Sequence, residues 1–150
     1  HALRALLPRE SVSKFTDLAL LTLIYPFAVT TEEETVEILK NVEYHLVKER
    51  GVIRYKMDRY YNNNIDGFSE EAEWCFGLAW LAIIYAERGD KERAYYYLRR
   101  AKNAVTPDGV VPELYYSNTD KPNPNTPLGW AESMYVVALQ KVKELEAKGR

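Results

Sequence analysis

The amino-acid sequence predicts an all-α fold in which the helices form an array of hairpins. Three observations lead to this prediction. Five segments have apolar residues at helical spacing, strongly apolar segments alternate with amphipathic ones, and the connections between them alternate between short and long. The chain has 150 residues, of which 47% are hydrophobic and 28% charged, as is typical of one globular domain with a sizeable core.

The first two helices are predicted to form an inner and an outer layer. Residues 11–24 are apolar on nearly every face, as a helix buried on most sides requires, and Pro26 ends them. Thr31 and Glu34 form the capping-box pattern of a second helix, which is expected to extend to Gly51. Its apolar stripe consists of Val36, Leu39, Val42 and Leu46. Charged residues surround this stripe, so the second helix is predicted to be amphipathic and outer.

The third predicted helix, residues 70–88, is a second inner helix. Its residues 74–84 are apolar on all sides, and Gly89 ends it. Ser69 is the expected N-cap. Glu70, Glu71 and Glu73 are interpreted as charges of its first turn, because carboxylates are favoured at the positive end of the helix dipole.

The last two predicted helices repeat the outer and inner pattern. Asp90 caps an outer helix that extends to about residue 104. Its apolar stripe consists of Ala94, Tyr97, Leu98 and Ala101. The fifth helix covers about residues 127–147. Its inward-facing residues are predicted to be Trp130, Met134, Val137, Ala138, Val142 and Leu145.

Two long connections separate these helices, and both precede an inner helix. They comprise residues 51–69 and 106–126, whereas the breaks near Pro26 and Gly89 are short. In an array of hairpins, both long connections therefore lie at the same end of the molecule. Long loops in compact domains are usually functional, so we expect the site at this end. No close internal repeat is present, which makes a solenoid the lesser possibility.

Composition excludes several classes of function. A net charge of -2 without a long Lys/Arg run argues against nucleic-acid binding, and no apolar run has the length of a membrane span. The single cysteine, Cys75, excludes an internal disulfide and is compatible with a reducing compartment such as the cytoplasm. His1 and His45 lack metal-ligand spacing, so neither a metal nor another cofactor is expected. Few glutamines beside abundant Glu, Lys, Arg and Tyr suggest a thermophilic source.

The residues that can carry chemistry lie in or beside the long connections. Glu113 has apolar and aromatic neighbours, although a single loop glutamate is more often simply solvated. Trp74 and Trp130 lie in the first turns of two predicted inner helices and suit sugar rings, but each alone is more often a core residue. Arg54 and Asp58 can hold sugar hydroxyls, and the alternative is a salt bridge that fixes the loop.

Three motifs follow one another along these segments: Arg54-Tyr55 with Asp58, Tyr60-Tyr61-Asn62 and then Trp74; Val111-Pro112-Glu113-Leu114-Tyr115; and Leu128-Gly129-Trp130. In this order and approximate spacing, from about residue 17 to residue 139, they resemble motifs of glucoamylases and related glucan hydrolases, glycoside hydrolase family fifteen. The resemblance implies part of an (α/α)6 barrel, because five helices are fewer than half of the twelve in that fold. Leu114 stands where the family usually has Gln, and Ala131-Glu132 replaces a sequence that contains Ser or His.

This resemblance implies a part of an inverting hydrolase that acts on α-glucosidic bonds. Glu113 would be the general base, Arg54 and Asp58 would bind sugar hydroxyls, and Trp74 and Trp130 would line the subsites. In the family, the general acid comes from an earlier loop, so the chain is expected to be a C-terminal portion of the catalytic domain without its acid. The alternative is a non-catalytic helical module that binds carbohydrate or a protein partner.

The expected partners follow from the same reading. They are an α-glucan or α-glucoside substrate and either the remainder of the barrel or a second copy of the chain. The association is expected through the inner helices, because residues 74–85 are apolar on all sides and the chain has too few helices to cover them.

Overall fold

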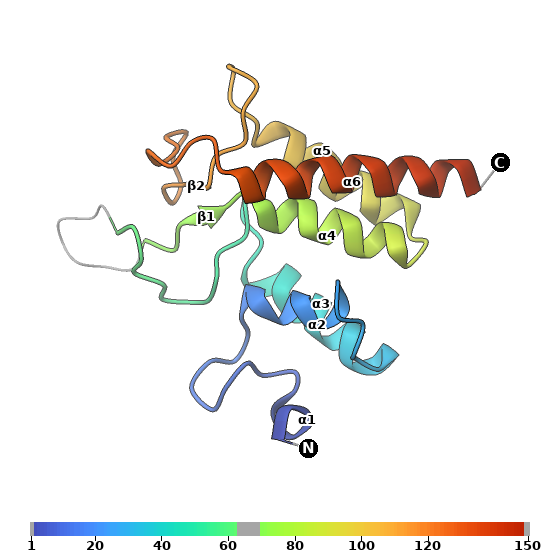
Figure 1. Ribbon diagram of the computed structural model, residues 1–150. Coiled ribbons are helices and arrows are strands. Elements are labelled where there is room, and N and C mark those ends of the chain that lie inside the picture. The colour runs from blue at the N-terminus through green and yellow to red at the C-terminus, as the bar shows by residue number, and fades with distance from the viewer. Residues whose placement is uncertain (1, 63–69, 149–150) are drawn as a thin grey trace.

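A computed structural model describes residues 2–62 and 70–148, and it is mainly helical (Figure 1). Its elements are α1 (Ala2–Leu6), the 3-10 helix η1 (Leu18–Leu20), α2 (Leu21–Ile24), α3 (Glu32–His45), β1 (Glu73–Trp74), α4 (Phe76–Glu87), α5 (Lys91–Asn103), β2 (Leu114–Tyr115) and α6 (Gly129–Lys148). The all-α prediction is confirmed, with a two-stranded antiparallel sheet added to it. None of the helices in the described ranges is both long and apolar enough to cross a membrane.

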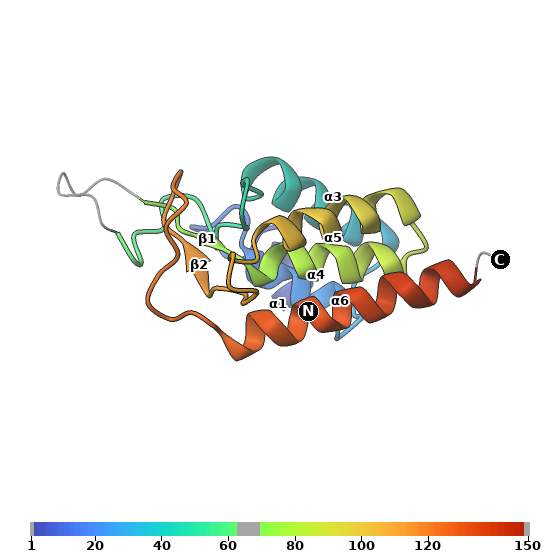
Figure 2. The same cartoon turned by 90° about the horizontal axis from the view of Figure 1, so that it is seen from above.

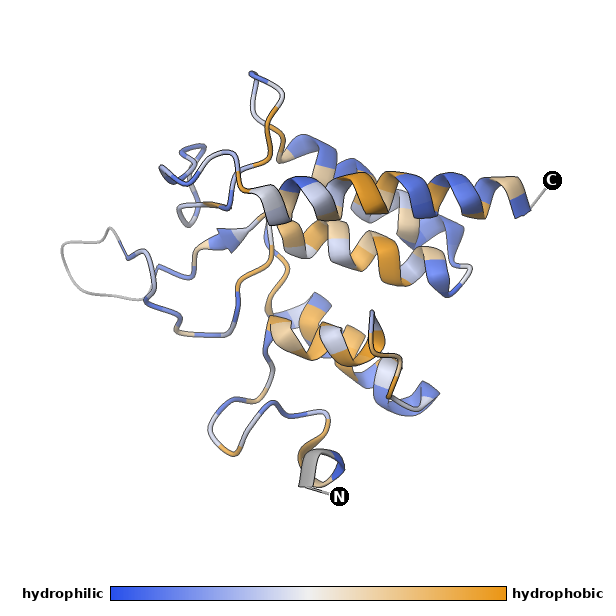
Figure 3. Cartoon of the chain, viewed as in Figure 1, coloured by the Kyte–Doolittle hydropathy of each residue, from blue (hydrophilic) through white to orange (hydrophobic). Residues whose placement is uncertain are grey.

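Helix α4 is the centre of the fold. All its residues from Phe76 to Ala86 are buried, while α5 and α6 pack along it and α2 also contacts it. Figure 2 shows the amphipathic α3 and α5 on one side of α4 and α6 on the other. Hydrophobic residues dominate α2 and α4 (Figure 3). The expectation that residues 74–85 cannot be covered is therefore wrong, because this chain alone buries them.

The amphipathic α3 begins where the sequence predicts and ends earlier. The Thr31 side chain accepts from the Glu34 backbone N–H, and the Glu34 carboxylate accepts from the Thr31 N–H, which confirms the capping box. The helix ends at His45 instead of continuing to Gly51. The Ile53 N–H donates to the Leu46 carbonyl at 2.9 Å, so the chain has already turned back on itself. The face of α3 that is buried consists of Thr35, Ile38, Leu39 and Val42, whereas Val36 is 49% exposed.

The first predicted inner helix is much shorter than residues 11–24. Asp17 is an N-cap whose carboxylate accepts from the Ala19 N–H, so helical structure begins only at Leu18. The Leu18 N–H donates to the Arg54 carbonyl at 2.7 Å, a bond that ties the preceding segment to the first long connection. Side-chain capping and a long-range backbone bond thus replace the first turns of the predicted helix.

The predicted helix of residues 70–88 begins only at Phe76. Before it, Glu73 and Trp74 form β1, so the glutamates at 70, 71 and 73 are not first-turn charges. The predicted N-cap, Ser69, lies outside the described residues. Backbone pairing of β1 with β2 and with Val52 outweighs the local helical pattern here.

The last two helices match their predictions closely. Asp90 caps α5 through the Arg93 N–H, after Gly89 with φ of +78° ends the preceding helix. The predicted stripe is confirmed by burial of Ala94, Tyr97 and Ala101. In α6, Ala138 and Val142 are buried, but Trp130 is 52% exposed.

Candidate functional site

A small β structure joins the two long connections at one end of the helices. In β1 and β2, Trp74 pairs with Leu114 and Glu73 with Tyr115. On the other edge of β1, the Val52 and Trp74 backbones exchange hydrogen bonds of 3.0 and 3.1 Å. Figure 1 shows these segments together beyond the ends of α4, α5 and α6. The two long connections therefore meet at one end of the helices, as the sequence predicts.

Glu113 lies beside this sheet, and its side chain is half-buried. The Cys75 N–H donates to the Glu113 carbonyl at 3.1 Å, which fixes the backbone of Glu113 to the start of α4. Its Oε2 accepts from Nδ2 of Asn123 at 2.6 Å and from Nδ2 of Asn125 at 2.8 Å. Two amides therefore hold the carboxylate in one orientation.

Tyr61 connects Glu113 to the first long connection. The Asn125 amide nitrogen is 2.8 Å from the Tyr61 hydroxyl, to which it donates. Burial, followed by the hydrogen bond to the Glu113 carboxylate, raises the pKa of Tyr61. Tyr61 also has φ of +60°, a left-handed conformation that is rare for an aromatic residue and typical of functional loops.

Arg54 and Asp58 form a two-point ion pair, which was the alternative reading of these residues. Arg54 Nε and one terminal nitrogen donate to the two Asp58 oxygens at 2.7 and 2.9 Å. Asp58 is completely buried, whereas 31% of the Arg54 side chain is exposed. The hydrogen bond to Asp58 raises the pKa of Arg54. Asp58 thus holds the guanidinium, and only Arg54 of this pair faces solvent.

Aromatic rings connect these groups into one cluster. The Arg54 guanidinium carbon lies 4.7 Å from the Tyr60 ring centre and 4.8 Å from that of Trp74. Trp74 is in edge contact with Tyr61 at 6.3 Å and with Phe76 at 5.9 Å.

The aromatic cluster continues to the start of α6. Trp130 stacks on Phe76 with ring centres 4.1 Å apart, and it is 52% exposed. The structure therefore brings together all five predicted residues: Arg54, Asp58, Trp74, Glu113 and Trp130.

Two buried polar atoms of this cluster have no hydrogen-bond partner within the described ranges. They are the Trp74 Nε1, a donor, and the Asn123 Oδ1, an acceptor. A buried polar group without a partner destabilises a protein by about 1–3 kcal/mol.

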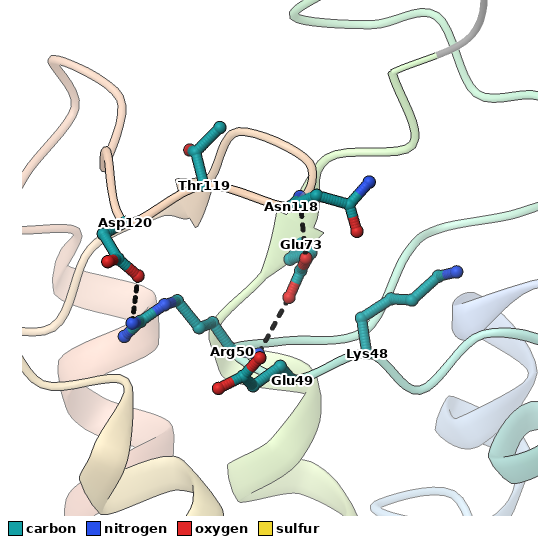
Figure 4. A pocket seen from close by; sticks show the side chains of 7 residues that line it. All are labelled: Lys48, Glu49, Arg50, Glu73, Asn118, Thr119 and Asp120. Atoms are coloured by element: carbon teal, nitrogen blue, oxygen red, sulfur yellow. Dashed lines mark hydrogen bonds and ion pairs between the residues drawn. The ribbon is translucent and has the colours of Figure 1, made fainter.

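The motifs did not identify every residue that shapes the site. Asn123 and Asn125 lie in the second long connection outside the three motifs, yet both amides contact Glu113. Their local signal is weak, because Asn beside Pro is equally typical of a turn. Glu73 was assigned to a helix, but its buried carboxylate lines a cavity of about 260 Å³ with Lys48, Glu49, Arg50, Asn118, Thr119 and Asp120 (Figure 4). No group of three or more potential metal ligands occurs in residues 2–62 and 70–148.

Comparison with known proteins agrees with this architecture. No family model matches the chain. Over 168 aligned residues it is 30% identical to a probable phosphorylase b kinase regulatory subunit alpha from Caenorhabditis elegans, an alignment that covers 90% of this chain and 14% of that protein. Among solved structures, it is similar to a wild-type glycosidase, with a TM-score of 0.70 and 21% identity.

The similarity to the glycosidase covers 85% of this chain and 36% of the glycosidase. A glycosidase variant in complex with glucose gives a TM-score of 0.69 at 20% identity. The chain thus spans about a third of the solved glycosidases and about a seventh of the curated relative. At this level of identity the likeness concerns the fold, and the chain has the fold of part of a glycosidase-like helical barrel.

Proposed function

We propose that this chain supplies part of the sugar cleft of a glucoamylase-like hydrolase, with Glu113 as the general base. The observation that carries the proposal is the fixed Glu113 carboxylate, which two amides hold beside Tyr61, whose ring contacts that of Trp74. A general base must be held within reach of the water from which it takes a proton. In an inverting hydrolysis, that water attacks the anomeric carbon on the face opposite to the leaving group.

The neighbouring residues have complementary roles in this proposal. Arg54 donates to sugar hydroxyls with the guanidinium edge that Asp58 leaves open. Asp58 acts through Arg54, since it is buried beneath it. The exposed face of Trp130 stacks on a sugar ring, while the buried Trp74 ring supports the wall of the cleft.

An inverting hydrolase also needs a general acid about 6.5–9.5 Å from the base. Within the described ranges, the second carboxylate of this cluster is that of Asp58, and Arg54 donates to both of its oxygens. We therefore expect residues 1–150 to hydrolyse maltooligosaccharides very poorly, because loss of acid assistance costs about 10²–10⁴-fold in rate.

α-D-Glucosyl fluoride separates the base from the acid. Its fluoride leaves without protonation, so its hydrolysis depends on the base and the sugar site alone. We expect the chain to release fluoride faster than buffer does and Glu113→Gln to lower the rate about 10²-fold or more. Glu37→Gln, an exposed change on α3, is the matched control and is expected to have no effect. Equal rates for the chain and Glu113→Gln would contradict the assignment of the base.

The curated relative favours a second candidate, because its name describes a regulatory subunit. In that case the same cluster binds maltooligosaccharides without hydrolysing anything. Binding can be followed by the fluorescence of the tryptophans in the cluster. Sugar binding that survives Glu113→Gln, together with no fluoride release by the unaltered chain, would support the binding module and reject the hydrolase.

A further inference from the structure

Glu73 is a buried carboxylate that the proposed hydrolysis does not use. It is 3% exposed and lies in β1, immediately before Trp74. Successive side chains of a strand point to opposite faces, so Glu73 and Trp74 lie on different sides of the small sheet. Burial of a carboxylate is costly unless hydrogen bonds satisfy it.

Both oxygens of Glu73 accept hydrogen bonds from backbone N–H groups. Oε2 accepts from the Arg50 N–H at 2.8 Å, and Oε1 accepts from the Asn118 N–H at 3.3 Å (Figure 4). Because α3 ends at His45, Arg50 lies in the first long connection as the structure has it, and Asn118 lies in the second. The side chain of Arg50 also pairs with Asp120 and lies over the Tyr115 ring at 5.1 Å. The Glu73 side chain therefore fastens both connections to β1, in addition to the backbone pairing of Val52 and β2.

Glu73 is next in the chain to a residue of the proposed sugar site. Trp74 is the next residue, and its backbone is paired with Val52 in the first connection. Residues 114 and 115 pair with β1, so Glu113 follows any movement of the second connection relative to β1. A shift at Glu73 would thus change the separation of the Glu113 carboxylate and the Trp74 ring.

We propose that Glu73 is a positioning residue that holds both long connections in register with β1 and so sets the position of Glu113 relative to Tyr61 and Trp74. The carboxylate is needed because it offers an acceptor to each N–H. A glutamine would offer one acceptor and turn its own NH₂ group toward the other backbone N–H. The link to catalysis depends on the proposed function, whereas the positioning of Trp74 does not.

The test compares the chain, Glu73→Gln and Tyr97→Phe, each labelled with 5-fluorotryptophan. Tyr97→Phe removes a hydrogen bond between outer helices and serves as a control for general destabilisation. In ¹⁹F NMR spectra, we expect Glu73→Gln to shift the Trp74 resonance and leave that of Trp80 in place, whereas Tyr97→Phe leaves both in place. Release of fluoride from α-D-glucosyl fluoride is expected to fall about tenfold or more in Glu73→Gln only.

The outcomes separate this proposal from the proposed function. An unshifted Trp74 resonance in folded Glu73→Gln would overturn the positioning role, whatever the activity. A shifted resonance in a chain that never acts on the fluoride would support positioning and reject the hydrolase. If Glu73→Gln does not fold, amide hydrogen exchange of the unaltered chain decides: slow exchange of the Arg50 and Asn118 amides supports the proposal, and exchange at unprotected rates overturns it.

Discussion

Two glutamates beside the small sheet have opposite surroundings. Glu113 accepts from side-chain amides and is half-buried, whereas Glu73 accepts from backbone amides and is 3% exposed. A half-buried carboxylate can reach water and substrate, whereas one that is 3% exposed cannot. The contrast is why we place chemistry at Glu113 and positioning at Glu73.

Arg54 gives a test of the ion pair beneath the cleft. Arg54→Lys replaces a planar, two-point donor with a single ammonium, which cannot match both Asp58 oxygens or stack on Tyr60 and Trp74. We expect a loss of about 1–3 kcal/mol of unfolding free energy, measured by urea denaturation. The matched control is Arg59→Lys, an exposed change in the same connection. Equal stability of the two variants would contradict the role given to the Arg54–Asp58 pair.

Cys75 gives a test of the burial of the residues that follow β1. Burial, followed by the negative charge of Glu73, raises the pKa of the Cys75 thiol. Since the thiolate is the reactive form, we expect a disulfide reagent at neutral pH to modify the folded chain about 100-fold more slowly than the urea-unfolded chain, or slower still. Raising the pH should favour unfolding, because the thiol of the unfolded chain ionises first. Reaction of the folded chain at the rate of free cysteine would show that this region opens.

Some residues of the site were accessible from the sequence and others were not. Glu113, Arg54 and Asp58 stand within recognisable motifs, so the sequence predicted them. The Asn123 and Asn125 amides act on Glu113 only after the second connection folds back, and turn chemistry explains the same residues equally well.

At the scale of elements, helices with local stop signals were predictable. The capping box of α3 and the Asp90 cap of α5 are both confirmed. They could be predicted because each cap joins residues only three positions apart in the sequence. β1 was misread as helix, because its partners, Val52 and β2, are distant in sequence. Such pairing has no local pattern, and the apolar composition of residues 72–76 fits a buried strand or a buried helix.

Gly51 gives a test of this pairing. A Cβ at Gly51 would lie 2.5 Å from the carbonyl carbon of Glu73 and 2.7 Å from the carbonyl oxygen of Trp74, and backbone atoms cannot yield as side chains do. We expect Gly51→Ala to lower the unfolding free energy by about 1–3 kcal/mol and to shift the Trp74 resonance. Gly89→Ala is the control: its φ of +78° is strained for alanine, at about 1 kcal/mol, but open space surrounds it. A Trp74 resonance that is unchanged in Gly51→Ala would contradict the close packing of Gly51 on β1.

At the scale of the whole molecule, exposed apolar side chains lie on α6, another of the predicted inner helices, and not at residues 74–85. The chain covers α4 itself, whereas exposed hydrophobic side chains occur on α6 at Trp130, Val136 and Leu139. The sequence pattern could not show this, because it does not reveal which apolar faces the neighbouring helices reach. The similar glycosidases extend well beyond the part that this chain matches.

Association through α6 is the prediction that follows from this surface. We expect size-exclusion chromatography with light scattering to give a mass above 17.4 kDa at micromolar concentration, because α6 exposes apolar side chains that a partner can bury. Leu139→Lys should shift the chain toward the monomer, and Lys143→Ala, on the same helix, should not. A monomer that binds no hydrophobic dye would show that the α6 surface needs no cover.

The central claim is that two connections far apart in sequence form one sugar site with Glu113 as its base. The most direct measurement is the anomeric form of the first glucose released from α-D-glucosyl fluoride, observed by ¹H NMR before mutarotation. Attack by a water that Glu113 activates, opposite the departing fluoride, gives β-D-glucose, and Glu113→Gln should abolish its formation. Release of α-D-glucose first, or release of β-D-glucose unaffected by Glu113→Gln, would contradict the account.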